Sequence, residues 1–158
     1  ILLQQIFPKL ISLFPEIKIS IIGKYLSNNI QKEIQQIEQI EYVGFVEDVN
    51  SLVSEALLMI APIFIGSGLK MKITHALACG TAVLTTPVGS EGIPLTDIDG
   101  LFIESLEEKL IRKCIRLLQN PESLAEIGSL GRLKVRKIFS NEIIGKKYND
   151  LYRKMMTR

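Results

Sequence analysis

The sequence predicts an α/β fold with a mainly parallel β-sheet, flanked by helices and followed by a helical C-terminus. Short apolar segments with strand character alternate with helical segments over residues 1–103. This alternation is typical of parallel sheets built from strand–helix–strand units. Several glycine-rich turns also follow the predicted strands directly, and after residue 104 every segment reads as helix.

In the first half, the spacing of apolar residues predicts three helices and three strands. Residues 17–23 first alternate between apolar and polar and then become wholly apolar, which predicts a strand buried on both faces. Either Asp48 or Asn50 would cap the third helix. In order, we expect a helix over 2–14 that Pro8 interrupts, a strand over 17–23, a short amphipathic helix within 24–40, a strand over 40–45, a helix over about 50–56 and a strand over 57–62.

In the second half, capping residues mark the helix ends. Ser105 with Glu108 predicts a capping box for a helix that continues to about Leu118. Pro121 suits the first turn of the next helix, and Ser140 opens the last one. The expected elements are a helix over 69–79, strands over 82–85 and 100–103, and helices that begin near 105, 120 and 140, the last of which continues to Met155.

Composition excludes several classes of protein. The chain has 158 residues, 47% apolar and 23% charged, which fits one packed domain, and its net charge of +2 gives no strong attraction to nucleic acid or to an anionic membrane. Cys79 and Cys114 lack the spacing of a metal site or a disulfide framework, and one histidine excludes a multi-histidine cluster. No apolar run is long enough to span a membrane. The chain begins at Ile1 without the features of a signal peptide. It also lacks an initiating methionine, so we expect a piece of a longer protein.

Basic residues gather towards the C-terminus. One interpretation is a solvated helical face, and another is weak contact with a membrane surface or an acidic partner. The basic residues in question are Lys134, Arg136, Lys137, Lys146, Lys147, Arg153, Lys154 and Arg158.

The turn Gly66-Ser67-Gly68 lies between a predicted strand and a predicted helix. Glycine has no Cβ, so the oxygens of a ligand can approach its backbone closely. The amides of Gly68, Leu69 and Lys70 would be the first unpaired donors of the helix, at the positive end of its dipole. Such a site suits a phosphate group, and Lys70 and Lys72 would help to neutralise a diphosphate. The alternative is a tight turn that binds nothing.

The helix over 69–79 has two faces. Leu69, Ile73, Ala76, Leu77 and Gly80 would pack on the sheet, whereas Ser67, Met71, His75 and Ala78 fall on the opposite side. His75 is therefore either a surface residue or a hydrogen-bond partner for a sugar or ribose hydroxyl. The turn at 85–92 is either an ordinary loop or part of the same cleft.

The flagged glycines share one place in the predicted sheet. Gly23, Gly44, Gly66 with Gly68, and Gly89 all follow strands. Ligands of parallel α/β sheets bind outside the carboxyl ends of the strands. The pattern therefore favours a real binding cleft.

Together these motifs resemble the donor-binding domain of retaining GT-B glycosyltransferases, the "group 1" family of nucleotide-sugar enzymes. The likeness extends from about Ile17 to the C-terminus, and residues 1–15 resemble the first helix of that domain. It rests on Gly44-Phe45-Val46, Ala61-Pro62, Gly66-Ser67-Gly68-Leu69-Lys70, Ala76-Leu77-Ala78-Cys79-Gly80 and Thr86-Pro87-Val88-Gly89 in this order.

The resemblance implies a Rossmann-like half of a GT-B fold and a metal-free reaction without cofactor. A sugar would move from a nucleotide diphosphate to an acceptor hydroxyl with its anomeric configuration kept, in glycan or polysaccharide biosynthesis in the cytoplasm or at the inner face of the membrane. Gly66, Ser67, Gly68, Leu69 and Lys70 would meet the sugar and phosphates of the donor. The loop after Gly23 with Phe45 and Val46 would lie near the base, and His75 would approach the ribose.

Two departures from the family qualify these expectations. A pair of glutamates eight positions apart is common in the family, and Ser67 and His75 occupy those positions here. The neutral imidazole accepts only one hydrogen bond, so donor affinity would differ. The second departure is truncation: in the family, a first strand and an acceptor-binding domain come before the part that this chain resembles, and residues 1–158 lack both. We therefore expect these residues to form the donor half of the enzyme. This half would be inactive alone and would contain no catalytic residues of its own.

Three other functions are compatible with the sequence to different degrees. A catalytically dead or scaffolding relative is suggested by His75, and a sugar-nucleotide epimerase would share the fold. A dinucleotide-binding dehydrogenase has little support, because no GxGxxG follows a strand.

Overall fold

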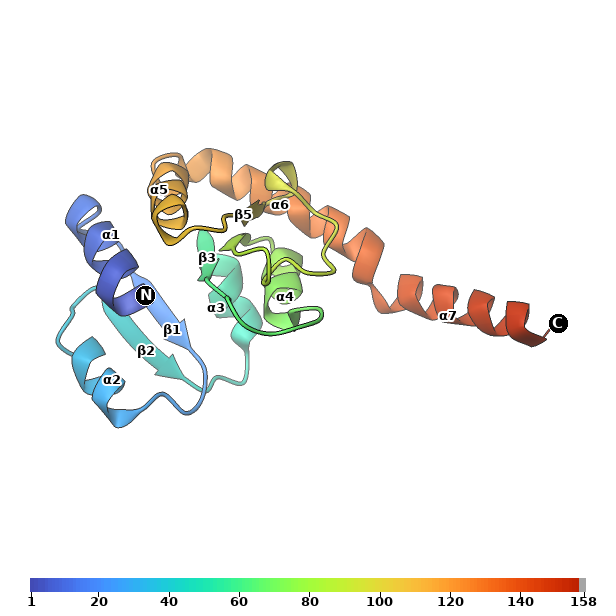
Figure 1. Ribbon diagram of the computed structural model, residues 1–158, viewed down its shortest axis with the longest axis horizontal. Coiled ribbons are helices and arrows are strands. Elements are labelled where there is room, and N and C mark those ends of the chain that lie inside the picture. The colour runs from blue at the N-terminus through green and yellow to red at the C-terminus, as the bar shows by residue number, and fades with distance from the viewer. Residues whose placement is uncertain (157–158) are drawn as a thin grey trace. The chain divides into compact units, whose positions relative to one another are not determined.

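The computed structural model describes residues 1–156 and divides the chain into two compact units, residues 1–49 and residues 50 onward. Each unit contains its own parallel sheet. Figure 1 shows the order of the helices and strands in each unit.

The first unit packs helices beside a two-stranded sheet. Strands β1 and β2 are parallel, with Ile19 opposite Ile40. Its buried apolar residues are Ile6, Phe7, Leu10, Ile34 and Ile40. The elements are the π-helix η1 (Leu2–Ile6), α1 (Phe7–Leu13), β1 (Ile19–Ile22), α2 (Asn28–Ile34) and β2 (Ile40–Gly44).

The helical segment divides just before Pro8, as expected: the π-helix η1 ends at Ile6 and α1 begins at Phe7, which places Pro8 in the first turn of α1, where a missing N–H is tolerated. One expectation for this unit needs correction. Strand β1 is not buried on both faces, because half-buried Ile19 and Ile21 alternate with exposed Ser20 and Ile22. A sheet of only two strands in a unit of this size buries less surface than a larger sheet would.

The second unit contains a three-stranded parallel sheet in the order β3-β4-β5. All four residues of the central strand β4 are buried. The elements are α3 (Val49–Glu55), β3 (Leu58–Ala61), α4 (Met71–Cys79), β4 (Ala82–Thr85), the 3-10 helix η2 (Asp97–Asp99), β5 (Leu101–Ile103), α5 (Glu107–Leu118), α6 (Pro121–Phe139) and α7 (Asn141–Met156). Since α3 begins at Val49, Asp48 stands at the cap position and Asn50 lies in the first turn.

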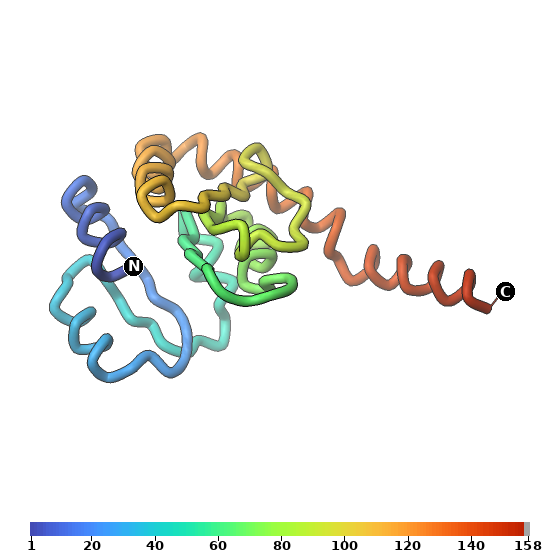
Figure 2. Tube along the Cα trace, in the orientation of Figure 1, coloured from blue at the N-terminus to red at the C-terminus, as the bar shows by residue number. Residues whose placement is uncertain are grey.

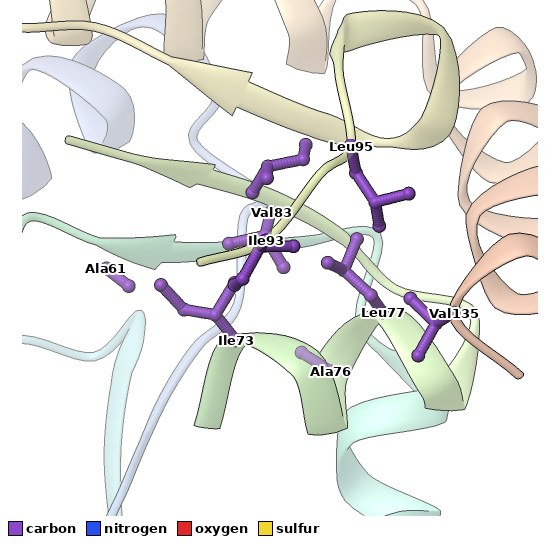
Figure 3. Packing of buried hydrophobic residues seen from close by; sticks show 9 residues of the cluster. Ala61, Ile73, Ala76, Leu77, Val83, Ile93, Leu95 and Val135 are labelled. Carbon is purple, nitrogen blue, oxygen red and sulfur yellow. The ribbon is translucent and has the colours of Figure 1, made fainter. Parts of the chain in front are cut away.

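The core of this unit joins the sheet to α4 and α6. Figure 3 shows α4 directing Ile73, Ala76 and Leu77 towards Val83 of β4, with Val135 of α6 beside them. Burial of these apolar side chains supplies the main stabilisation of the unit. The core cluster consists of Ala61, Ile73, Ala76, Leu77, Val83, Ile93, Leu95, Leu101 and Val135.

The capping box expected at Ser105 and Glu108 is absent. Helix α5 begins at Glu107 with Leu106 at the cap position and no side-chain cap, so Ser105 lies one residue too early. Glu108 instead lies 3.6 Å from Arg112 one turn along the helix. The capping box among these elements lies at η2, where Thr96 and Asp99 cap each other.

The final helix α7 follows α6 after Ser140, whose hydroxyl accepts a hydrogen bond from the amide of Ile143 at 3.4 Å. Figure 2 shows α7 continuing from the end of α6 and leading away from the sheet of the second unit. In residues 1–156, no helix has both the length and the apolar character needed to cross a bilayer.

Candidate functional site

The loop between β3 and α4 presents a row of unpaired backbone amides. Within the described part of the chain, no backbone or side-chain acceptor pairs with the amides of Gly66 through Lys72. Residues 64–69, which form most of this loop, are exposed. Gly68 has φ 72°, a left-handed conformation that glycine adopts without strain, and a Cβ added there would meet open space. The loop therefore offers its donors to an incoming acceptor.

The helix itself begins two residues later than the sequence predicts. Lys70 is its N-cap, and the Lys70 carbonyl accepts from the amides of Ile73 at 2.9 Å and Thr74 at 3.3 Å. The amides of Met71 and Lys72 are therefore the unpaired donors at the helix end, rather than those of Gly68, Leu69 and Lys70. The helix dipole still concentrates positive potential at this end. The reason for the shift is that Lys70 has extended backbone angles, φ −89° and ψ 95°.

Lys70 places its charge on the loop itself. Its Nζ donates to the Gly68 carbonyl at 2.7 Å and lies 3.8 Å from a carboxylate oxygen of Glu91. The Lys70 side chain is only 13% exposed, while that of Glu91 is 53% exposed. An ammonium held beside unpaired amides makes the loop a concentrated site of positive charge.

His75 lies one turn into α4 and contacts Asn50 of α3. The distance from His75 Nε2 to Asn50 Oδ1 is 2.7 Å. An amide oxygen only accepts, so the neutral imidazole carries its proton on Nε2 and keeps Nδ1 as its acceptor. Cys79 Sγ lies 3.9 Å from both of these atoms. His75 is thus held in place rather than exposed without contacts.

Ser67 and Leu69 are both exposed on the loop. Leu69 was expected to pack on the sheet, but its side chain is 40% exposed and lies near Gly92 instead. The buried face of α4 is formed by Ile73, Ala76 and Leu77, as expected, together with Thr74.

The turn at 85–92 is held by its own hydroxyl groups. Thr85 donates to the Ala61 carbonyl at 2.7 Å, and Thr86 donates to the Ile63 carbonyl. Both threonines are buried. These hydroxyls fasten the turn to the end of β3, so the turn contributes Glu91 to the loop rather than hydroxyl groups.

In the first unit, Gly23 and Phe45 follow β1 and β2. The Gly23 amide donates to the Gly44 carbonyl at 2.9 Å, and its carbonyl accepts from the Tyr42 hydroxyl at 2.9 Å. Phe45 is 64% exposed, and Lys24 Nζ lies 3.8 Å from the centre of its ring. Val46 is half-buried. An exposed aromatic ring beside a cation suits a planar, electron-rich group.

The predicted residues fall into these two separate groups, one in each unit. Sequence reasoning missed Asn50 as the partner of His75, Glu91 as the partner of Lys70, and Lys24 at Phe45. Each belongs to a pair that no short-range motif encodes. In residues 1–156 no cluster of three metal-ligating side chains occurs.

A hollow of about 290 Å³ lies elsewhere, between α5 and α6. None of the predicted residues lines it, and the geometry described above does not involve it. Its lining includes Lys113, Arg116, Asn120 and Ser123.

Comparison with known proteins decides the family. The sequence model described as "Glycosyl transferases group 1" matches residues 1–120. The chain belongs to this family. The chain is also similar to a GDP-mannose-dependent monoacylated α-(1-6)-phosphatidylinositol monomannoside mannosyltransferase of Corynebacterium glutamicum, with 24% identity over 94% of this chain and 42% of that protein.

Solved structures agree on the fold. HepE of Anabaena in complex with UDP aligns with TM-score 0.80 and 15% identity, over 96% of this chain and 45% of that one. Sucrose-phosphate synthase of Thermosynechococcus elongatus aligns with TM-score 0.78 and 20% identity, over 96% of this chain and 41% of that one. The chain therefore spans less than half the length of these relatives. The expected α/β fold with parallel strands, as in GT-B glycosyltransferases, and the helical C-terminus are confirmed.

Proposed function

We propose that this chain binds the donor of a glycosyltransferase reaction, a nucleotide-diphosphate sugar. One observation carries the proposal: the amides of Gly66 through Lys72, beside the positive end of α4, have no acceptor within the described chain, and residues 64–69 around them are exposed. Family membership supports it, as does the presence of UDP and UDP-glucose in two structures of the neighbour HepE.

The chemistry follows from the charge that develops on the leaving group. When the bond between sugar and diphosphate breaks, negative charge grows on the diphosphate oxygen. Amides already fixed in the loop stabilise that charge without reorganisation. Lys70 Nζ, 2.7 Å from the Gly68 carbonyl, would exchange that neutral acceptor for the diphosphate. We propose that these groups, rather than a metal ion, balance the charge, so a chelator should leave donor affinity unchanged.

The remaining roles follow the family resemblance. Gly23, Phe45 and Val46 would lie near the base, with the ring of Phe45 offering a stacking surface. His75 would accept one ribose hydroxyl through Nδ1, because Asn50 engages Nε2. We further propose transfer with retention of configuration in polysaccharide synthesis at the cytoplasmic side. Acceptor contacts and catalytic groups would come from a second domain, in line with relatives more than twice as long.

Calorimetric titration of the chain with UDP-, GDP- and ADP-sugars tests donor binding. We expect one nucleotide class to bind. Gly68→Ala should weaken that binding by about tenfold, since a side chain at positive φ costs about 1–2 kcal/mol in this conformation. Gly145→Ala in α7, where an added Cβ meets open space, is the matched control and should bind as the unchanged chain does.

Two outcomes would count against the proposal. One is that no nucleotide sugar of any of the three bases binds. The other is that Gly68→Ala and Gly145→Ala bind equally well while both remain folded by circular dichroism.

A further inference from the structure

Tyr25 lies in the loop between β1 and α2 in a strained backbone conformation. Its φ is 66°, in the left-handed region, and among the non-glycine residues of the described chain it alone has a positive φ. A bulky residue in this region is an outlier, because its Cβ comes close to the following carbonyl oxygen. Such strain persists where the surrounding structure enforces it, and it gathers at ligand clamps and active sites.

Hydrogen bonds on both sides of Tyr25 fix the loop that carries it. Before it, the Gly23 amide donates to the Gly44 carbonyl at 2.9 Å. After it, the Leu26 carbonyl accepts from the side-chain amide of Gln31 at 2.7 Å. Only two residues lie between these fixed points, and the left-handed conformation of Tyr25 lets the chain turn in that short space.

Packing within the fold does not offset the strain at Tyr25. The residue is 95% exposed, so its ring buries almost no apolar surface. Burial of an aromatic ring is the usual way in which such a side chain stabilises a fold. The ring of Tyr25 contributes little of this kind, and both of its faces are open to a ligand.

Tyr25 lies beside the residues proposed for the base. Strands β1 and β2 are parallel and end together, with Ile22 opposite Gly44. Lys24, Tyr25 and Phe45 therefore follow the carboxyl ends of two neighbouring strands, where ligands of such sheets bind. Lys24 Nζ lies 3.8 Å from the centre of the Phe45 ring and covers one of its faces. The next residue, Tyr25, adds a second aromatic surface at the same edge.

We propose that Tyr25 binds the base of the donor nucleotide, with its ring stacked on the face of the base. The inference rests on the proposed donor binding and adds a residue that holds the base. Every base has a π-face, so stacking on an aromatic ring tolerates different bases. Tyr25 should therefore strengthen the binding of a nucleotide and should have no effect on a phosphate compound that lacks a base.

Calorimetric titration of the chain with UDP, GDP, ADP and inorganic pyrophosphate tests the proposal. Asparagine tolerates the left-handed conformation, so Tyr25→Asn removes the ring and leaves the backbone as it is. We expect this variant to bind the preferred nucleoside diphosphate about tenfold more weakly, while its affinity for pyrophosphate stays within about twofold. Tyr25→Phe keeps the ring and should bind the nucleotide as the unchanged chain does.

The matched control is Tyr152→Asn, the same substitution at an exposed tyrosine of α7, which should leave nucleotide affinity unchanged. Because the ring of Tyr25 is not packed, thermal denaturation should show Tyr25→Asn to be as stable as the unchanged chain.

Three outcomes would overturn the proposal. If Tyr25→Asn and Tyr152→Asn bind the nucleotide equally well, Tyr25 does not hold the base, although donor binding itself stands. If Tyr25→Asn melts at a lower temperature, or loses affinity for nucleotide and pyrophosphate alike, Tyr25 is a structural residue. If the unchanged chain binds none of the three nucleotides, the proposed donor binding fails together with the role of Tyr25.

Discussion

His75 occupies a position where many members of the family have a glutamate, and its setting changes what the site can offer. The imidazole is tied to Asn50 at 2.7 Å through Nε2, so only Nδ1 remains to accept a hydrogen bond. A carboxylate at this position would accept two or more. His75 therefore offers fewer hydrogen-bond acceptors at the proposed ribose contact than a glutamate would.

His75→Glu should tighten nucleotide binding. A second accepted hydrogen bond is worth about 1 kcal/mol, or roughly fivefold in affinity. Calorimetric titration with the nucleotide that binds the unchanged chain measures the effect. His75→Gln, which has one side-chain carbonyl acceptor, is the control and should stay within about twofold. Weaker binding by the glutamate variant would mean that this position does not meet the ribose.

Asp99 is a second residue whose environment fixes its behaviour. Burial raises the pKa of this carboxyl, but hydrogen bonds from Lys134 at 2.7 Å and from Thr96 outweigh burial and lower the pKa below 3.8. The folded chain thus holds the proton of Asp99 less readily than the unfolded chain. This stabilisation is present above the ordinary pKa of the carboxyl and is lost as pH falls through the lowered pKa.

Asp99→Asn should lower the free energy of unfolding at pH 7 by about 1–3 kcal/mol. The difference from the unchanged chain should shrink as pH falls below about 4. Urea denaturation at several pH values measures it. Asp97→Asn removes a more exposed pair with Lys113 and should cost less than about 1 kcal/mol. If the loss of unfolding free energy in Asp99→Asn did not depend on pH, the lowered pKa of Asp99 in the folded chain would be contradicted.

At the scale of elements, close packing of α6 depends on two glycines. A Cβ at Gly128 would fall against the carbonyl oxygen of Gly80, and one at Gly131 would fall against that of Asp99, both well inside van der Waals contact. These backbone atoms belong to the segments that flank α4 and β5. The glycines therefore set how near α6 can approach the core of the second unit.

Gly128→Ala should destabilise the chain by about 1–3 kcal/mol through overpacking. Gly145→Ala, in an open part of α7, should instead stabilise its helix by about 0.5–1 kcal/mol. Thermal denaturation of both variants gives the comparison. A lower melting temperature for Gly128→Ala together with a higher one for Gly145→Ala would support the packing account. A higher melting temperature for Gly128→Ala would refute it.

Local patterns predicted most elements but not every helix start. Strand β4 is found at residues 82–85, as predicted, because a short apolar run between glycine-rich turns has few alternatives. Ser105 failed as a cap because α5 begins after Leu106. The start of α4 moved to Met71 because the loop keeps Lys70 extended. Helix starts depend on loop geometry, which the sequence around a cap determines only in part.

At the scale of the whole molecule, the sequence predicted the glycine-rich loop but not its partners. Asn50 contacts His75, which lies 25 residues further along the chain. Glu91 lies near Lys70 although the whole of β4 separates the two residues in the sequence. Such contacts arise from the packing of separate elements, so no local spacing reveals them. The prediction that residues 1–158 form one donor-binding domain stays a prediction, because each unit is described by itself.

The two units should differ in their ability to fold alone. Residues 50–158 contain a three-stranded sheet with a continuous core, whereas residues 1–49 have one pair of strands and few buried residues. A segment of that size buries too little surface to be stable without help. Circular dichroism and denaturation should show a cooperative transition for the fragment 50–158 and none for 1–49. A cooperative transition of the smaller fragment alone would contradict this expectation.

The most direct test of donor binding at the α4 loop is a nitrogen–proton correlation spectrum of the chain during titration with the nucleoside diphosphate that binds in calorimetry. Hydrogen bonds from the loop to phosphate should shift the amide resonances of Gly66 through Lys72 well beyond those of α5 and α6. The account predicts that these shifts saturate together at the calorimetric affinity. Unmoved loop amides in the presence of bound nucleotide would contradict it.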